Sequence, residues 1–212
     1  SEMCIRDRLQ ALAPELAECA PGELTSAKAP HLKSIVRMGT AKTQGMFNFD
    51  EVCSMGGATE RERMTEIAAT LQPDDAINIQ FTSGTTGNPK GATLSHFNIL
   101  NNGLQVGAGM RFSKDDRLCI PVPLYHCFGM VMGNLACLTH AACAVFPDEG
   151  FDPEVVLRTV AEEQCTALHG VPTMFVAETD LSNIEDYDLS SLRTGVMAGA
   201  PCPLELLSLI HI

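Results

Sequence analysis

A ten-residue segment, 82–91, contains the residue types that bind phosphate groups. It reads TSGTTGNPKG, so four hydroxyl side chains, three glycines and one lysine fall within ten positions. Glycines let backbone N–H groups approach an anion without an intervening Cβ atom, and hydroxyls add donors that rotate toward its oxygens. Lys90 would add a mobile positive charge. The segment therefore predicts a loop that binds a polyphosphate, although the same residue types are common in solvated surface turns.

The order of these residues differs from two common nucleotide-binding loops. Lys90 follows Pro89, whereas the loop of many NTPases has a Gly-Lys pair followed by Ser or Thr. No Gly-Lys-Ser/Thr string occurs in the chain, and the segment does not match Gly-x-Gly-x-x-Gly. The sequence therefore disfavours a phosphate-loop hydrolase of the usual type.

Apolar residues at alternating or helical spacing mark the elements that would position this segment. The expected strands are 31–38, 77–82, 117–122, 141–146, 166–169 and 192–197. The expected helices are 49–55, 60–71, 129–138 and three more that begin near Ser95, Asp152 and Pro172. Strand and helix alternate at short spacing, which predicts an α/β fold with a parallel sheet and helices on both faces.

The phosphate-binding segment should connect a buried strand directly to a helix. The strand is 77–82, and Ser95 is the expected cap of the helix. On that helix Phe97, Leu100 and Leu104 recur at helical spacing, so they are expected to face the core.

Two other segments also follow expected strands. They are 123–128 and 198–201. Ligands bind at the carboxyl ends of the strands in sheets of this kind. One edge of the sheet could therefore bring both segments together with 82–91.

The phosphate-binding segment resembles the signature of the adenylate-forming enzymes, which include acyl-CoA synthetases, aryl-CoA ligases, luciferases and the adenylation domains of peptide synthetases. The run 77–102 is most similar to medium-chain acyl-CoA ligases. Three further motifs match in order and spacing: 123–130 (PLYHCFGM), 169–175 (HGVPTMF) and 199–203 (GAPCP). The resemblance covers residues 31–206 and implies part of the large N-terminal domain of that fold.

The resemblance implies a two-step reaction. A carboxylic acid attacks the α-phosphate of ATP, with Mg²⁺ present, to give an acyl-adenylate and pyrophosphate, and coenzyme A then displaces AMP. The expected function is that of an ATP-dependent fatty acyl-CoA ligase, with a medium-chain fatty acid favoured. Alternatives are an aryl-CoA ligase, another adenylate-forming enzyme, or a truncated nucleotide-binding protein without activity. An α-amino acid is disfavoured, because adenylation domains usually have Phe-Asp where this chain has Tyr125-His126.

The resemblance also assigns roles to individual residues. The expected catalytic residues are Lys90, Thr82 and His126. The expected ATP-binding residues are Thr82, Ser83, Gly84, Thr85, Thr86, Gly87, Lys90, Gly199, Ala200 and Pro201. The expected acyl-binding residues are Tyr125, His126, Gly170 and Val171. Lys90 would contact the β- and γ-phosphates, and 199–201 would lie against adenine.

His126 has two interpretations. It is either an ordinary structural histidine or, as the resemblance implies, a residue that orients the substrate carboxylate or gates the site. A carboxylate is already ionised at pH 7 and attacks phosphate without a general base. The catalytic groups should therefore be donors and cations that stabilise charge on phosphate.

The composition excludes several classes of protein. A net charge of −12 argues against nucleic acid as a partner. No apolar run is long enough for a membrane span, and no Cys/His cluster has the spacing of a metal site. Nine scattered cysteines without a Cys-x-x-Cys pair suit reduced thiols inside a cell, in the cytoplasm or the mitochondrial matrix. Five of them are expected to be buried: Cys119, Cys127, Cys137, Cys143 and Cys165.

The two ends resemble translated sequencing-adapter read-through. On this interpretation 1–8 and 207–212 are non-native tails, and 9–206 is a partial AMP-binding domain. The Tyr-Gly-x-Thr-Glu motif, the ribose-binding Asp and the C-terminal lysine domain of the family have no counterpart in the chain. The isolated chain is therefore expected to be inactive or nearly so.

Overall fold

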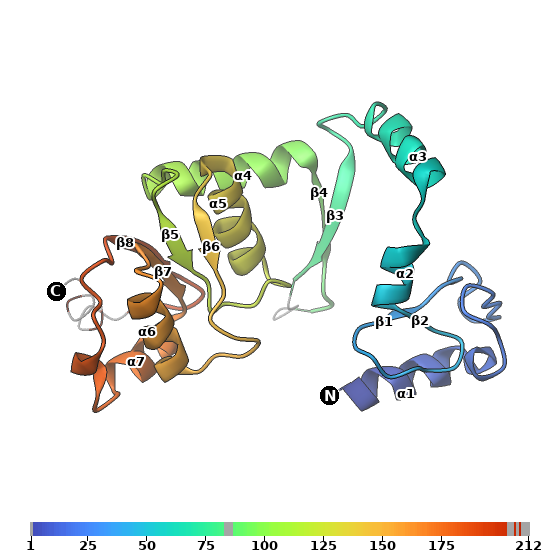
Figure 1. Cartoon of the computed structure of the whole chain (residues 1–212), viewed down its shortest axis with the longest axis horizontal. Helices are drawn as coiled ribbons and strands as arrows, with labels where there is room; N and C mark the ends of the chain where they lie inside the picture. Colours follow the sequence, from blue (N-terminus) through green and yellow to red (C-terminus); the bar gives the residue numbers. More distant parts are fainter. Residues whose placement is uncertain (1, 83–86, 203–205, 207, 209–212) are drawn as a thin grey trace. The chain divides into compact units, whose positions relative to one another are not determined.

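The computed structural model describes residues 2–82, 87–202, 206 and 208 of the 212-residue chain (Figure 1). The chain divides into two compact units, Ser1–Leu71 and Gln72–Ile212. Ser83, Gly84, Thr85 and Thr86, which were predicted to bind ATP, lie outside the described residues, as does residue 203 at the end of the motif 199–203.

The first unit is built around a small apolar core. Its elements are α1 (Glu2–Leu12), the 3₁₀ helix η1 (Pro14–Ala17), β1 (Val36–Arg37), β2 (Phe47–Asn48), α2 (Phe49–Met55) and α3 (Ala58–Ala68). The core consists of Ala13, Leu16, Leu24 and Met46. Helix α2 has the predicted bounds, whereas the strand expected at 31–38 is only two residues long.

The second unit contains a four-stranded parallel sheet. Its strands are β5 (Arg117–Cys119), β6 (Cys143–Val145), β7 (Ala167–Gly170) and β8 (Thr194–Met197), in the order β6-β5-β7-β8. The register pairs Cys119 with Val145 and Leu168, and Leu168 with Gly195. At Gly195 a Cβ atom would collide with the Leu168 carbonyl oxygen, so glycine permits this pairing.

Helices cover both faces of this sheet. Along β5, Leu118 belongs to one apolar cluster and Cys119 to another, because successive side chains of a strand point to opposite faces. The first cluster includes residues of the π-helix η2 (Phe128–Leu135) and of α5 (Ala136–His140), onto which α4 (His96–Gly109) packs. The second includes residues of α6 (Pro153–Glu162) and α7 (Pro172–Thr179). The predicted α/β fold is therefore confirmed.

Local signals placed several helix starts correctly. Ser95 Oγ accepts a hydrogen bond from the Asn98 amide at 3.2 Å at the start of α4. Asp152 Oδ1 accepts one from the Val155 amide at 3.1 Å, and Pro153 occupies the first position of α6. A short 3₁₀ helix, η3 (Ile184–Asp186), follows α7. Of the cysteines expected to be buried, Cys119, Cys137 and Cys165 are buried, but Cys127 and Cys143 are exposed.

The expected passage from strand to loop to helix around 82–91 was wrong. The strand β3 (Ala76–Phe81) pairs antiparallel with a second strand, β4 (Gly91–Ser95), so the segment is the loop of a β-hairpin (Figure 1). This hairpin forms a two-stranded sheet of its own. Strand β3 is also not buried, since Ile79 and Phe81 are 61% and 67% exposed.

The face of α4 that packs inward also differs from the prediction. Phe97, Leu100 and Leu104 are exposed. The buried positions are Ile99, Gly103 and Gly107. The two glycines, one helical turn apart, let the backbone of η2 and α5 approach α4 closely: a Cβ atom on Gly103 would lie 2.7 Å from Leu135 Cβ. Close backbone packing therefore overrides the larger apolar side chains on the other face.

One buried carboxylate, that of Asp116, connects the amino ends of the strands. Its Oδ1 accepts hydrogen bonds from Thr166 Oγ1 at 2.7 Å and from Arg193 Nε at 2.9 Å. Its Oδ2 accepts from the Ser113 amide at 2.8 Å, and its backbone oxygen accepts from the Cys143 amide at 2.8 Å. Burial acts to raise the pKa of Asp116, but the hydrogen bonds from Thr166, Arg193 and Ser113 outweigh it and lower the pKa from 3.8 to about 2.

Replacing Asp116 with asparagine should lower the free energy of unfolding by about 2 kcal/mol at pH 7. The folded-state pKa lies below the unfolded value, so the carboxylate stabilises the fold above pH 3.8, and this contribution is lost as the pH falls toward about 2. Denaturant unfolding at a series of pH values measures both effects. Asp115→Asn is the control, because the Asp115 side chain is 79% exposed and should contribute almost nothing. Equal acid sensitivity in the two variants would contradict the prediction.

Replacing Gly103 with alanine should lower the melting temperature, although alanine favours helix by about 1 kcal/mol. The new Cβ atom would lie 2.7 Å from Leu135 Cβ and 3.0 Å from the Leu135 carbonyl carbon, so η2 and α5 must move away at a cost of roughly 1–3 kcal/mol. Gly109→Ala is the matched control in the same helix, since a Cβ atom there would meet no neighbouring element within 4 Å. Thermal unfolding should show a lower midpoint for Gly103→Ala and an unchanged or higher one for Gly109→Ala.

Candidate functional site

The base of the predicted phosphate-binding segment is closed by two residues with predicted roles. The Thr82 amide donates to the Lys90 carbonyl at 2.9 Å, and the Lys90 amide donates to Thr82 Oγ1 at 3.1 Å. Gly87 and Lys90 are exposed. Ser83, Gly84, Thr85 and Thr86 lie outside the described residues. The structure therefore shows the two ends of the predicted loop, and two hydrogen bonds hold Thr82 and Lys90 together there.

Gly91 allows the strands to pair directly behind Lys90. It lies opposite Phe81 in the hairpin. A Cβ atom at Gly91 would be 3.0 Å from Ile79 Cγ2 and 3.4 Å from the Phe81 ring. A larger residue would therefore crowd the Ile79 and Phe81 side chains, which are exposed and would have to shift slightly.

The turn after β5 carries Tyr125 and His126 at the surface. The Tyr125 side chain is 84% exposed, and His126 is also exposed. The Phe128 amide donates to His126 Nδ1 at 3.1 Å, so the imidazole satisfies the first amide of η2. Because Nδ1 accepts this bond, the neutral ring carries its proton on Nε2. His126 thus has a structural contact, while Nε2–H is the ring donor that could meet a carboxylate.

The hairpin and this turn are joined by a residue for which sequence reasoning made no claim. Gln80 Nε2 donates to the Tyr125 carbonyl oxygen at 3.3 Å. Gln80 lies two positions before Thr82, and its side chain is on the face of β3 opposite the exposed Ile79 and Phe81. The sequence signal for Gln80 was a polar side chain that alternates with the apolar residues of β3. Figure 1 shows the hairpin ending beside the connection that leaves β5.

The ends of β7 and β8 bring three further predicted residues together. The Ala198 amide donates to the Gly170 carbonyl at 3.2 Å. Gly199 has a φ of +91°, and a Cβ atom there would lie 3.2 Å from Val171 Cγ1. Glycine therefore permits both the left-handed backbone conformation and the close approach to Val171. Ala200 and Pro201 follow and are exposed.

The predicted site residues thus come from two places in the second unit. Segments 123–128 and 198–201 follow parallel strands, as predicted, and 170–171 lies at the end of β7 between them. The segment 82–91 belongs to the separate hairpin, which Gln80 ties to the turn at Tyr125. Among the described residues, no hydrogen bond joins Lys90 to 170–171 or 198–201.

Besides Asp116 and the cysteines, two buried ionisable side chains in the described part of the chain were not assigned roles from the sequence. His169 is fully buried, and burial lowers its pKa below the usual value of 6.5. Its Nε2 lies 3.0 Å from the Met132 carbonyl oxygen, and its Nδ1 lies 3.2 Å from the Val196 amide nitrogen. Glu178 on α7 is 3% exposed, and burial raises its pKa to about 8. In the sequence, the only indication that His169 or Glu178 is buried was its position within a mostly apolar run.

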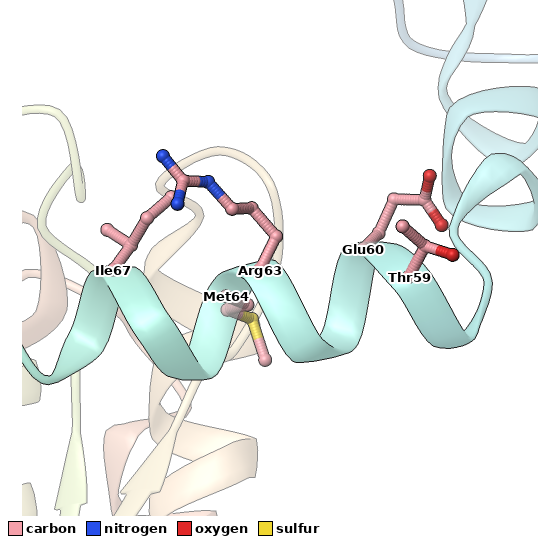
Figure 2. A pocket seen from close by; sticks show the side chains of 5 residues that line it. All are labelled: Thr59, Glu60, Arg63, Met64 and Ile67. Carbon is pink, nitrogen blue, oxygen red and sulfur yellow. The ribbon is translucent and has the colours of Figure 1, made fainter.

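Neither the hollow on α3 nor a cluster of possible metal ligands forms an enclosed site in the described part of the chain. A shallow hollow lies along α3, lined by Thr59, Glu60, Arg63, Met64 and Ile67 (Figure 2). All five residues come from one helix, so the hollow is an open helix surface rather than an enclosed pocket. In residues 2–82, 87–202, 206 and 208, no group of three or more His, Cys, Asp or Glu residues could bind a metal ion. None of the helices described is both long and apolar enough to cross a membrane.

Comparison with known proteins assigns this chain to a family. The putative acyl-CoA synthetase YngI of Bacillus subtilis is 46% identical over 204 residues, which is 96% of this chain and 37% of YngI. The mitochondrial medium-chain acyl-CoA ligase ACSF2 of Danio rerio is 39% identical over 203 residues, which is 95% of this chain and 33% of that ligase. The chain therefore spans about a third of the length of these curated relatives.

A solved structure has the same fold. The anthranilate CoA ligase AuaEII in complex with anthranoyl-AMP matches with a TM-score of 0.71 and 25% identity, over 84% of this chain and 34% of AuaEII. The model of the family described as "AMP-binding enzyme" matches residues 8–211. This match covers almost the whole sequence, so the chain belongs to the AMP-binding enzyme family.

Proposed function

We propose that this chain is part of an ATP-dependent fatty acyl-CoA ligase. Such an enzyme activates a carboxylic acid as an acyl-adenylate and transfers the acyl group to coenzyme A. The observation that supports the proposal most is the Gln80–Tyr125 hydrogen bond of 3.3 Å. It joins the hairpin with the phosphate-binding segment to the turn with His126, and the reaction needs a nucleotide phosphate and a carboxylate side by side.

The proposed roles follow from the chemistry of each group. The Lys90 ammonium and the hydroxyls of 82–86 would stabilise negative charge on the phosphates, each charge-assisted hydrogen bond contributing ~1.5–3 kcal/mol. Mg²⁺ would bind together with ATP and neutralise further phosphate charge. The His126 Nε2–H group would donate to the substrate carboxylate, which orients it toward the α-phosphate. The proposal needs no general base, because the carboxylate is ionised at neutral pH.

The segments at the ends of β7 and β8 would bind the rest of the two substrates. Gly199, Ala200 and Pro201 would lie against adenine, where an exposed backbone and small side chains allow a flat ring to approach. Gly170 and Val171 would form part of the wall of the acyl channel. Gly199 lies close to Val171, since a Cβ atom added at Gly199 would be 3.2 Å from Val171 Cγ1, so these two surfaces adjoin.

The proposed class of substrate is based on the names of the similar proteins. The name of the Danio rerio ligase supports a medium-chain fatty acid. An aryl acid is the second candidate, because AuaEII, which has the same fold, is an anthranilate CoA ligase in complex with an aryl adenylate. We further propose that the isolated chain does not turn over substrate, since it spans about a third of the length of its relatives.

Replacing Lys90 with alanine should slow adenylate formation by ~10²–10³-fold, because the pyrophosphate leaving group loses a stabilising cation. The measurement is carboxylate-dependent ATP–pyrophosphate exchange, in a protein that contains this chain together with the remaining motifs of the family. Lys114→Ala is the control, since Lys114 is a surface lysine that pairs with Asp115 at 3.0 Å. Exchange that is equally fast in both variants would remove Lys90 from the proposed site.

A panel of octanoate, coumarate and benzoate should separate the two candidate substrates. In the longer protein, CoA-dependent AMP release should be fastest with octanoate if the medium-chain proposal holds. Faster release with coumarate or benzoate would favour the aryl candidate instead. The 212-residue chain alone should release no AMP with any of the three acids. Turnover of octanoate, ATP and CoA by the isolated chain would disprove the proposed inactivity.

A further inference from the structure

The environment of His169 fixes a single form of its imidazole ring. The side chain is fully buried at the end of β7. The Val196 amide can only donate a hydrogen bond, so His169 Nδ1, 3.2 Å away, must accept it. The Met132 carbonyl can only accept, so Nε2, 3.0 Å away, must carry the proton and donate it. The ring is therefore neutral, with its proton on Nε2 and both nitrogens in use.

These contacts connect the elements from which three segments of the site extend. Met132 belongs to η2, whose first amide is bonded to His126. Val196 belongs to β8, which leads into Gly199. His169 itself directly precedes Gly170–Val171. In addition, the His169 and Phe128 rings lie 5.3 Å apart between centroids, so the first residue of η2 packs against the same imidazole.

We propose that His169 is a positioning residue for the site, which sets the relative placement of the His126 turn, Gly170–Val171 and 199–201. The proposal rests on the proposed function for the roles of these three segments. The hydrogen bonds of His169 do not depend on those roles, so they can be tested separately.

The amino ends of the same strands provide an internal reference. There, Thr166 and Arg193 donate to Asp116, which does not contact His169. A residue that acts only on overall stability would affect both edges of the sheet. A positioning residue at the carboxyl edge should affect the loops at that edge before the amino edge responds.

The first test detects the tautomer directly. Long-range ¹H–¹⁵N spectra of the 212-residue chain with ¹⁵N-labelled histidine, recorded at pH 7, should contain a His169 signal from a neutral imidazole with its proton on Nε2 and an Nδ1 that accepts a hydrogen bond; the chain has six histidines, so this signal is assigned by its loss on substitution. The His169→Phe variant should lack this signal. A ring that is doubly protonated, or that carries its proton on Nδ1, would overturn the proposal.

The second test compares substitutions that remove one or both bonds. His169→Phe keeps a ring of similar size but has neither donor nor acceptor. His169→Gln retains an ε-position donor for Met132, and His169→Asn retains a δ-position acceptor for Val196. Hydrogen exchange well below the melting temperature should be about tenfold faster at amides 126–130, 198–200 and 202 in His169→Phe, and less affected in the other two.

The same measurement contains its controls. Amides near Asp116, Thr166 and Arg193 should exchange as in the unmodified chain. His31→Phe, which removes an exposed histidine from the first unit, should change neither set. Equal acceleration at both edges of the sheet in all three His169 variants, or no local change in any of them, would overturn the proposal.

A third measurement relates the loops to the ligand. The affinity of the chain for a fluorescent ATP analogue should fall at least about fivefold in His169→Phe, with partial recovery in His169→Gln, because misplaced loops bind less tightly. Faster local exchange with unchanged affinity would show that His169 does not position this site. If neither the unmodified chain nor a longer protein that contains the remaining motifs of the family binds nucleotide, the proposed function fails, while the tautomer and exchange measurements still decide the role of His169.

Discussion

Asp116 is the residue on which the order of the parallel sheet depends. It directly precedes β5, its backbone oxygen bonds to Cys143 at the start of β6, and its carboxylate accepts from Thr166 before β7 and Arg193 before β8. One acidic residue therefore touches the beginning of all four strands. Loops at the far ends of such short strands can be placed no more accurately than the strands themselves, so this contact at one edge underlies the geometry at the other.

The hairpin is held in place differently from the strands of the four-stranded sheet. Within the described part of the chain its two strands pair only with each other, and a two-stranded sheet has little stability of its own in water. Its attachment to the body comes from Gln80 and from the start of α4, where the His96 amide bonds to the Asp75 carbonyl at 3.2 Å. The segment that would bind phosphate is thus carried by a less constrained part of the unit than the loops after β5, β7 and β8.

Features encoded within a few residues could be predicted from the sequence. The caps at Ser95 and Asp152, the helix that begins at Pro172 and the alternation of strands with helices were all correct. Features that depend on distant residues could not be. The short run Gly91–Ser95 becomes a strand because β3 pairs with it, and α4 turns Ile99 and Gly103 inward because Leu135 and Ala136 approach there. The motifs predicted that 123–128, 170–171 and 198–201 belong to the candidate site, whereas the contacts of Gln80 and His169 depend on residues far away in the sequence.

The π-helical form of η2 has a consequence for the direction of His126. Each residue of an α-helix turns the chain by about 100°, and a π-helix accommodates an extra residue within a turn. η2 continues directly into α5, which is packed against α4. Losing one residue from Phe128–Leu135 would preserve a helix but rotate its first turn relative to α5. The number of residues in η2 therefore contributes to the direction in which the His126 ring faces.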